Sequence, residues 1–409
     1  MIRLPYWFKT HALLILIIAL FVNLVQGFFQ FGYNITIPLM QDSLGMSYTQ
    51  AGALMTIGWG TRTISNLFFG TLSARFGPKI IASSNVLLAA LAMVVIAFTP
   101  NYTITALAMI AMGIGTGGSI SPVMGLLSSW FKTHDRGLAA GIASSGTGLA
   151  FTVPGVILPF LLVAIGTEAW RTIWFSFGFI SLLVGIASFL IIYDPNKASA
   201  SKKVVRNLSS SWPIEVFKNS FVWLLAYLAF WSGWATTIFA AFSGLYLANT
   251  FHISIGTISN LAIMAGIVSI GSGVLWGRIS DYLGRGPAFL LTFLVQTVAF
   301  VLLWLFPSLP SFIVAYLIMG LTLRSSYVIC AASAGDYVPT KFAPAAFGLM
   351  ATGASLGSAI SPLISGITAD YTGTLQWAFS LGVFANFVSI LGAIYLIKKE
   401  KTIPLAERR

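Results

Sequence analysis

Long apolar segments recur along the whole chain and are separated by short polar stretches. Each segment has roughly 20 residues or more, which is the length that a helix needs to cross the hydrocarbon core of a bilayer. The pattern therefore predicts an all-α membrane protein with twelve transmembrane helices. The predicted spans are 12–36, 49–73, 79–98, 103–130, 137–164, 170–193, 221–248, 255–279, 287–306, 311–335, 343–368 and 375–397.

Only one polar segment is long, "NKASASKKVVRNLSSSWP" at 196–213. It lies between the sixth and the seventh span. We therefore expect a bundle of six helices at 1–195, a linker at 196–219 and a second six-helix bundle at 220–409.

The two predicted bundles match each other at a constant shift of 207 residues. The shift superimposes Gly or Trp on the same residue type at six pairs: Gly70 and Gly277, Gly77 and Gly284, Gly113 and Gly320, Gly141 and Gly348, Gly146 and Gly353, and Trp170 and Trp377. Repeated halves of this kind predict pseudo-symmetric bundles with a substrate site near the middle of the membrane.

Composition supports a membrane protein and disfavours an enzyme. Of the 409 residues, 57% are hydrophobic and 8% are charged, whereas a soluble domain has about 25% charged residues. The sequence contains no nucleophile–base arrangement, metal-ligand cluster or nucleotide-binding loop, so we expect no catalytic residue, metal or cofactor. The single cysteine, Cys330, excludes an internal disulfide and is expected to pack as a small apolar side chain.

The net charge of +12 is explained by membrane topology. Nineteen of the 22 Lys and Arg residues fall in the termini, the linker and loops that share one side of the membrane if both termini are cytoplasmic. Such an asymmetry is the positive-inside rule. The basic charge therefore predicts an orientation with cytoplasmic termini, and it does not indicate nucleic-acid binding.

Two arginines depart from this distribution because they lie inside predicted helices. Arg62 is about thirteen residues into the second span and Arg324 about thirteen residues into the tenth. An arginine at a helix centre costs about 2.5–3.5 kcal/mol on insertion scales, so each must face a cavity or a partner. The ten acidic residues and three histidines all lie in predicted loops or at helix ends. The sequence thus contains no acid at the depth of either arginine.

Three interpretations of the arginines are open. Both bind backbone carbonyls and amide side chains as structural contacts, or one is structural and the other functional, or both receive an anionic substrate. The third interpretation is chemically direct, because a guanidinium binds a carboxylate through two parallel hydrogen bonds and stays protonated. Asn66 shares the helix face of Arg62, and Tyr327 that of Arg324.

Two loop segments carry a resemblance to a known family. "GTLSARFGPK" at 70–79 and "GRISDYLGRG" at 277–286 resemble the repeated loop signature of the major facilitator superfamily. The first copy has Ala74 where the family has Asp, and the second has Tyr282 where the family has Arg. The resemblance implies gating roles for Gly70, Arg75, Gly77, Asp281, Gly284, Arg285 and Arg136. Asp281 is the better latch candidate, the alternative being an acid that merely faces water.

In this superfamily the first, fourth, seventh and tenth helices line the substrate cavity. The resemblance therefore implies that further binding residues are Gln26, Gln30, Tyr33, Ser119, Trp231 and Trp234, beside Arg62, Arg324, Asn66 and Tyr327.

The chain is most similar to bacterial monocarboxylate and oxalate–formate carriers. This implies transport of a small organic anion by alternating access in the inner membrane of a prokaryote, by a monomer with protons as one candidate coupling ion. The alternatives are a proton-coupled drug or metabolite efflux carrier, an inorganic anion carrier of the nitrate type and, more remotely, a membrane receptor that transports nothing.

Overall fold

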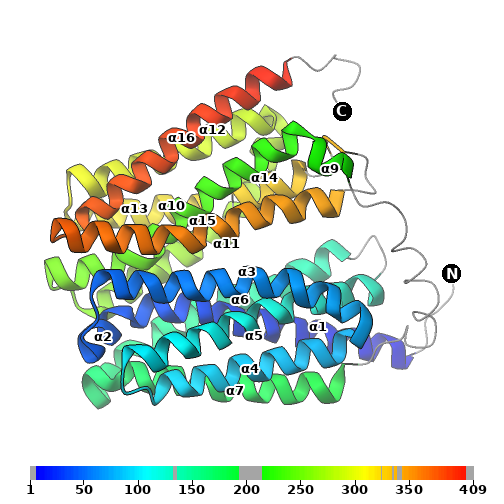
Figure 1. Ribbon diagram of the computed structural model, residues 1–409, viewed down its shortest axis with the longest axis horizontal. Coiled ribbons are helices and arrows are strands. Elements are labelled where there is room, and N and C mark those ends of the chain that lie inside the picture. The colour runs from blue at the N-terminus through cyan, green and yellow to red at the C-terminus, as the bar shows by residue number, and fades with distance from the viewer. Residues whose placement is uncertain are drawn as a thin grey trace. The chain divides into compact units, whose positions relative to one another are not determined.

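The computed structural model describes residues 6–131, 136–192, 214–323, 325–333, 336–338 and 343–401, and every regular element in these ranges is a helix (Figure 1). The chain divides into two compact units. Unit 1 comprises Met1–Gly45 and Ile57–Ser210, and unit 2 comprises Met46–Thr56 and Ser211–Arg409.

The first half of the chain contains α1 (Tyr6–Gly27), the π-helix η1 (Phe28–Gly32), α2 (Tyr33–Leu44), α3 (Tyr48–Phe76), α4 (Pro78–Ala97), α5 (Tyr102–Trp130), α6 (Arg136–Ile165), the 3₁₀ turn η2 (Gly166–Glu168) and α7 (Ala169–Ile191). The second half contains α9 (Ile214–Lys218), α10 (Ser220–Phe251), α11 (Ile255–Leu283), α12 (Arg285–Leu305), α13 (Leu309–Thr322), α14 (Ser325–Ser333), α15 (Ala343–Thr372) and α16 (Gln376–Glu400).

The 207-residue repeat is visible in the helix boundaries. Both ends of α3 and α11 are separated by this shift, and so are both ends of α6 and α15. The packing repeats as well, because α4 packs against α5 and α7 as α12 packs against α13 and α16, and α1 packs against α6 as α10 packs against α15. Each half of the chain therefore folds by the same pairing of helices.

The first predicted span differs from the observed helices, whereas the tenth agrees with them. The first, predicted at 12–36, is a longer helical run from Tyr6 to Leu44 that passes through η1. The tenth, predicted at 311–335, corresponds to a single candidate span from Leu309 to Ser333 that comprises α13 and α14. The Ser325 hydroxyl donates to the Thr322 carbonyl at 2.6 Å.

Glycines on two faces of α5 bring it close to two neighbouring helices. A Cβ atom on Gly113 would lie 2.0 Å from Thr61 Oγ1, and one on Gly117 would lie 2.2 Å from the Arg62 carbonyl oxygen. These two glycines therefore face α3. Gly115 and Gly118 face α4 in the same manner. Small residues at this spacing allow helix backbones to approach closely inside a membrane protein.

The start of α3 packs against α15 within unit 2. The Asp370 carboxylate accepts hydrogen bonds from the backbone N–H groups of Tyr48 at 3.0 Å and Thr49 at 2.7 Å. The first N–H groups of a helix have no partner in the helix itself, and a carboxylate there is favoured by the helix dipole. A Cβ atom on Gly52 would lie 2.1 Å from the Pro362 carbonyl oxygen. The beginning of α3 is thus fixed to α15, while the helix from Ile57 onward belongs to unit 1.

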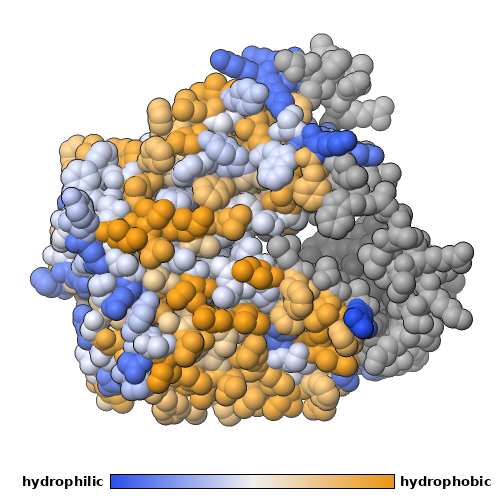
Figure 2. Space-filling view, in the orientation of Figure 1, coloured by the Kyte–Doolittle hydropathy of each residue, from blue (hydrophilic) through white to orange (hydrophobic). Residues whose placement is uncertain are grey.

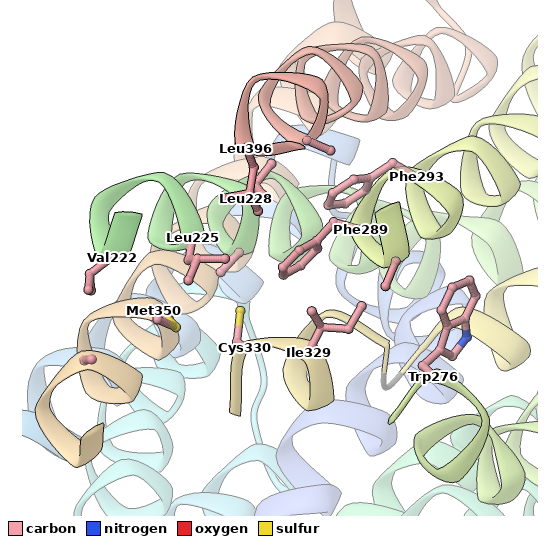
Figure 3. Packing of buried hydrophobic residues seen from close by; sticks show 14 of the residues in the cluster. Val222, Leu225, Leu228, Trp276, Phe289, Phe293, Ile329, Cys330, Met350 and Leu396 are labelled. Atoms are coloured by element: carbon pink, nitrogen blue, oxygen red, sulfur yellow. The ribbon is translucent and has the colours of Figure 1, made fainter. Parts of the chain in front are cut away.

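Unit 2 has a buried apolar cluster between α10, α11, α12, α14, α15 and α16 (Figure 3). Phe289 and Phe293 stack with their ring centroids 5.9 Å apart, and both are fully buried. Cys330 lies in this cluster as a buried free thiol. Its predicted role as a small apolar packing residue is therefore confirmed.

The surface of the helices is strongly apolar, as membrane insertion requires. Val163, Phe160 and Leu190 are 91%, 73% and 72% exposed. Figure 2 shows apolar side chains over much of the visible face and hydrophilic ones towards the helix ends. In the described part of the chain, nine helices are long and apolar enough to span a bilayer, or ten if the two parts of α11, bent by 42°, count as one span. Exposed apolar surface of this extent suits contact with lipid.

Candidate functional site

Arg62 lies at the middle of α3 and is half-buried within unit 1. One of its terminal nitrogens, Nη2, donates a hydrogen bond of 2.8 Å to Oε1 of Gln26 on α1. Among the described residues, no acidic side chain pairs with this guanidinium. Within this part of the chain, Arg62 therefore has a neutral hydrogen-bond partner and no carboxylate that compensates its charge.

Two aromatic rings flank the guanidinium. Its central carbon lies 4.8 Å from the ring centroid of Trp59 and 5.9 Å from that of Phe29. The two rings meet edge to face at 5.5 Å. Cation–π contacts of this kind contribute about 0.5–2 kcal/mol each. They hold the arginine head group in place and leave its charge unneutralised.

The π-helix η1 carries Phe29 and directly follows the turn that carries Gln26. A π turn inserts an additional residue and rotates the side chains that follow it, and such turns are frequent at functional sites. Its last residue, Gly32, packs closely, because a Cβ atom there would lie 2.4 Å from the Phe177 ring. The apolar periodicity did not predict this turn, although the glycines at 27 and 32 on either side of three aromatic residues were a usable signal.

Two buried nitrogen atoms beside Arg62 have no hydrogen-bond partner among the described residues. They are Nε2 of Gln26 and the indole Nε1 of Trp59. Buried polar groups are nearly always hydrogen-bonded in native proteins, so unpaired donors require an explanation. Here both orphan atoms are donors, and both belong to residues in direct contact with Arg62.

Asn66 lies one helical turn after Arg62 and faces a polar neighbour on α5. Its side-chain oxygen accepts a hydrogen bond of 2.6 Å from the Ser121 hydroxyl. The Asn66 side chain is exposed. Its role in substrate binding stays a prediction.

The other predicted residues of unit 1 differ in their surroundings. Gln30 is half-buried in η1, and Tyr33 is completely buried at the start of α2. Ser119 is also completely buried, and its hydroxyl donates to the Thr116 carbonyl of its own helix at 3.1 Å. Ser119 thus has the contacts of a helix-packing residue, and its role in binding stays a prediction.

In unit 2, Trp231 and Trp234 lie on α10 with their ring centroids 5.5 Å apart. Both indole nitrogens are buried without a hydrogen-bond partner among the described residues. Tyr327 on α14 is 58% exposed and meets Phe347 edge to face at 5.3 Å. Arg324, the second predicted cation, lies outside the described residues.

Comparison with known proteins identifies the family of this fold. The profile of the Major Facilitator Superfamily matches residues 19–243 and 228–408. The chain belongs to the Major Facilitator Superfamily. Its members are transporters, so the protein is a multi-pass membrane transporter and not an enzyme.

Curated superfamily relatives are similar over most of their length. The chain is 23% identical to a probable sulfoacetate transporter of Cupriavidus necator, covering 89% of this chain and 88% of the relative. It is 23% identical to a hexuronate transporter of Bacillus subtilis (93% of each chain) and 23% identical to the oxalate:formate antiporter of Oxalobacter formigenes (94% and 91%). A bacterial homologue of the lysosomal transporter Spinster has the same fold, with a TM-score of 0.73 at 15% identity over 100% of this chain and 99% of that one.

The two copies of the superfamily signature form equivalent turns. Gly77 between α3 and α4 has φ of +89°, and Gly284 between α11 and α12 has φ of +92°. Such positive angles favour glycine because it has no Cβ atom. Gly70 lies within α3, and Arg75 near its end is exposed, with its guanidinium carbon 5.4 Å from the Phe76 ring centroid. Arg136 begins α6, and its side chain is outside the described part of the chain.

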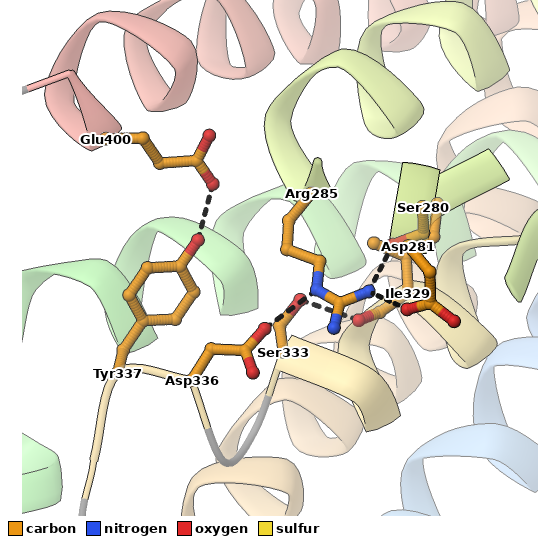
Figure 4. A network of polar contacts seen from close by, with 8 residues as sticks. All are labelled: Ser280, Asp281, Arg285, Ile329, Ser333, Asp336, Tyr337 and Glu400. Carbon is orange, nitrogen blue, oxygen red and sulfur yellow. Dashed lines mark hydrogen bonds and ion pairs between the residues drawn. The ribbon is translucent and has the colours of Figure 1, made fainter. Parts of the chain in front are cut away.

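In the second signature copy, Arg285 binds two carboxylates within unit 2 (Figure 4). Its Nε donates to Asp336 at 2.7 Å, and its Nη1 donates to Asp281 at 2.7 Å and to the Ser280 hydroxyl at 2.8 Å. The Asp281 side chain is 70% exposed, whereas those of Arg285 and Asp336 are 19% and 29% exposed. The latch role expected for Asp281 stays a prediction, and in this structure its carboxylate is bound by the arginine four residues later.

Tyr337 continues this polar cluster towards the end of α16. Its hydroxyl donates to the Glu400 carboxylate, its ring stacks on Phe221 at 4.7 Å, and its carbonyl accepts from Asn219 at 2.6 Å. Burial and the Glu400 carboxylate raise the pKa of the Tyr337 phenol well above its ordinary value. The phenol therefore stays protonated at neutral pH and remains the donor in this bond.

Replacing Arg285 with Gln should destabilise unit 2 by about 1–3 kcal/mol, because the change removes charge-assisted hydrogen bonds and leaves Asp336 partly buried without its cation. The exposed Asp281 should contribute little of this loss. The measurement is the apparent melting temperature of the purified protein in detergent. The control is Arg278→Gln, since Arg278 is exposed on α11. Equal melting temperatures for the two variants would contradict the assigned role of Arg285.

Proposed function

We propose that this superfamily member transports a small organic anion by alternating access, with Arg62 as a binding group for the carboxylate. The observation that carries the proposal is a mid-helix arginine whose described hydrogen-bond partner is the neutral Gln26. An uncompensated cation within the membrane region is costly and typically marks a substrate pathway. An anion would relieve the cost by supplying the missing negative charge.

The relatives support the sign of the substrate charge. The similar transporters are named for sulfoacetate, for hexuronates, and for oxalate and formate. All of these compounds are organic anions. A small monocarboxylate such as lactate or pyruvate, or a dicarboxylate such as oxalate, would suit a guanidinium flanked by Trp59 and Phe29. The carboxylate would bind the nitrogens, and the carbon part would contact the rings. Arg324 is proposed as the second cation of the substrate pathway, with Gln30, Tyr33, Ser119, Trp231, Trp234 and Tyr327 as further binding residues.

The proposed cycle uses the two repeated halves at 1–195 and 220–409, joined by the linker at 196–219. The signature residues Gly70, Arg75, Gly77, Arg136, Asp281, Gly284 and Arg285 would control the transition between states. We propose that the protein acts as a monomer in the inner membrane of a prokaryote. Both termini would be cytoplasmic, because the basic residues follow the positive-inside rule. Protons are a candidate coupling ion, and the proposal requires no cofactor.

The decisive test is uptake of labelled anions into proteoliposomes that contain the purified protein. The panel comprises lactate, pyruvate, acetate, oxalate, sulfoacetate, glucuronate and nitrate, each with and without a pH gradient. We expect saturable uptake of at least one organic anion. Stimulation by an inward proton gradient would indicate symport, and stimulation by internal unlabelled anion would indicate exchange. Transport of only neutral or cationic compounds would refute the proposal, and transport of nitrate alone would favour the inorganic alternative.

A further inference from the structure

Gln26 has an amide whose orientation is determined by its neighbour. Its side chain is 4% exposed, and Oε1 accepts the hydrogen bond from Arg62. A guanidinium has only donors, so the amide oxygen must face Arg62 for any hydrogen bond to form between them. The amide –NH₂ group of Gln26 must then point away from the guanidinium. Arg62 thus sets which end of the amide is available to a third group.

The remaining polar atoms around Arg62 are donors as well. Nε2 of Gln26 is buried and has no hydrogen-bond partner among the described residues. The same is true of Nε1 of Trp59, whose ring lies 4.8 Å from the Arg62 guanidinium carbon. Among the described residues, the only hydrogen-bond acceptor at this guanidinium is Oε1 of Gln26, which already accepts the bond from Arg62. Three side chains in contact therefore present N–H groups without matching acceptors.

We propose that Gln26 and Trp59 complete with Arg62 a donor-only subsite that selects a fully deprotonated oxyanion head group, either a carboxylate or a sulfonate. The inference rests on the proposed function in taking the ligand to be an anion. It adds that Gln26 is a specificity-determining residue which donates to the ligand while it positions Arg62. A protonated acid or an amide would direct its own donor against one of these N–H groups, and a mismatch of this kind gives strong discrimination.

The inference explains why an amide suits position 26 better than an acid would. A carboxylate at this place could reach the guanidinium in the same way, because Glu and Gln have the same shape. It would neutralise Arg62 inside the protein and would offer no donor to the ligand. Gln26→Glu should therefore fold and lose anion binding. Gln26→Met should keep the charge of Arg62 free but lose one donor and the positioning bond.

The test is ligand binding to the full purified chain in detergent, measured by calorimetric titration and by the shift in melting temperature. The probes are acetate and methanesulfonate, with acetamide as the neutral probe of the same shape as acetate. We expect both anions to bind the wild type and acetamide not to bind. Gln26→Glu should abolish anion binding, and Gln26→Met should weaken it about tenfold or more.

The matched control is Gln50→Glu. Gln50 forms a capping box with Ser47 at the start of α3, where an acidic side chain serves equally well. Melting temperatures without ligand establish that each variant is folded. If the wild type binds the anions and Arg62→Gln does not, while both Gln26 variants bind like the wild type, the subsite inference is wrong and the proposed function stands. If the wild type and Arg62→Gln respond equally to all three probes, both are wrong.

Discussion

Replacing Arg62 with Gln is expected to eliminate saturable anion uptake in proteoliposomes, and Arg62→Lys is expected to reduce it strongly. Among the described residues, Arg62 is the one cation that lies at the middle of a helix and next to unpaired hydrogen-bond donors. Loss of one member of a desolvated charge pair costs about 2–5 kcal/mol, which is roughly 30-fold or more in affinity. Lysine retains the charge, but it lacks the planar fork that binds Gln26 and a carboxylate at once.

The uptake experiment for Arg62 needs a control that changes the net charge equally. Arg278→Gln removes an exposed basic residue on α11 and should leave the half-saturating concentration unchanged. The reconstituted amounts are compared by size-exclusion profiles and by melting temperature. Wild-type uptake rates in Arg62→Gln would show that this arginine is a structural contact to Gln26 and that the anion binds elsewhere.

Gly117→Ala is expected to lower the melting temperature by several degrees and to reduce uptake as well. A Cβ atom at this position would lie 2.2 Å from the carbonyl oxygen of Arg62 and 2.9 Å from its Cα atom. These are backbone atoms, so α3 and α5 would have to move apart at the level of the arginine. Overpacking of this kind typically costs about 1–3 kcal/mol. The displacement would also move the guanidinium relative to Gln26, which lies on a different helix.

The same helix provides a control for this substitution. A Cβ atom on Gly125 of α5 would meet no atom within 4 Å. Gly125→Ala should therefore leave uptake unchanged and should keep or slightly raise the melting temperature, because Ala favours a helix over Gly. If the two variants behave alike, close packing of α5 on α3 does not position Arg62.

The location of Arg62 illustrates how much the sequence could predict about the site. Its depth followed from counting along an apolar span, and the lack of an acidic partner followed from the positions of the ten acids. Its hydrogen bond to Gln26 could not be derived in this way, because the two residues are separated by 36 positions and lie on different helices. Gln30, one turn further along the chain, was an equally good candidate by helical spacing alone.

The signature turns illustrate a second limit. The sequence located Gly77 and Gly284 and related them through the repeat, and both have the positive φ that a turn of this type needs. The binding of Asp281 and Asp336 by Arg285 was not foreseen, since Asp336 follows α14 and is brought to Arg285 only by the packing of the unit. For Asp281, the loop signature suggested a latch, whereas tertiary contacts supply a partner within its own unit.

By itself, the sequence determined that this protein is a helical membrane protein with two repeated halves and that Arg62 lies at the middle of one helix, while its resemblance to a known family indicated a transporter. The helical repeat and the position of Arg62 follow from local quantities, which are the length of apolar segments, the spacing of glycines and the position of charges. Only the tertiary structure decided that Gln26, Trp59 and Phe29 surround Arg62, that α1 passes through a π turn beside it, and that Gly117 supports its backbone. The reason is physical: the partner of a polar group is set by which helices pack together, and close packing joins residues that are distant along the chain.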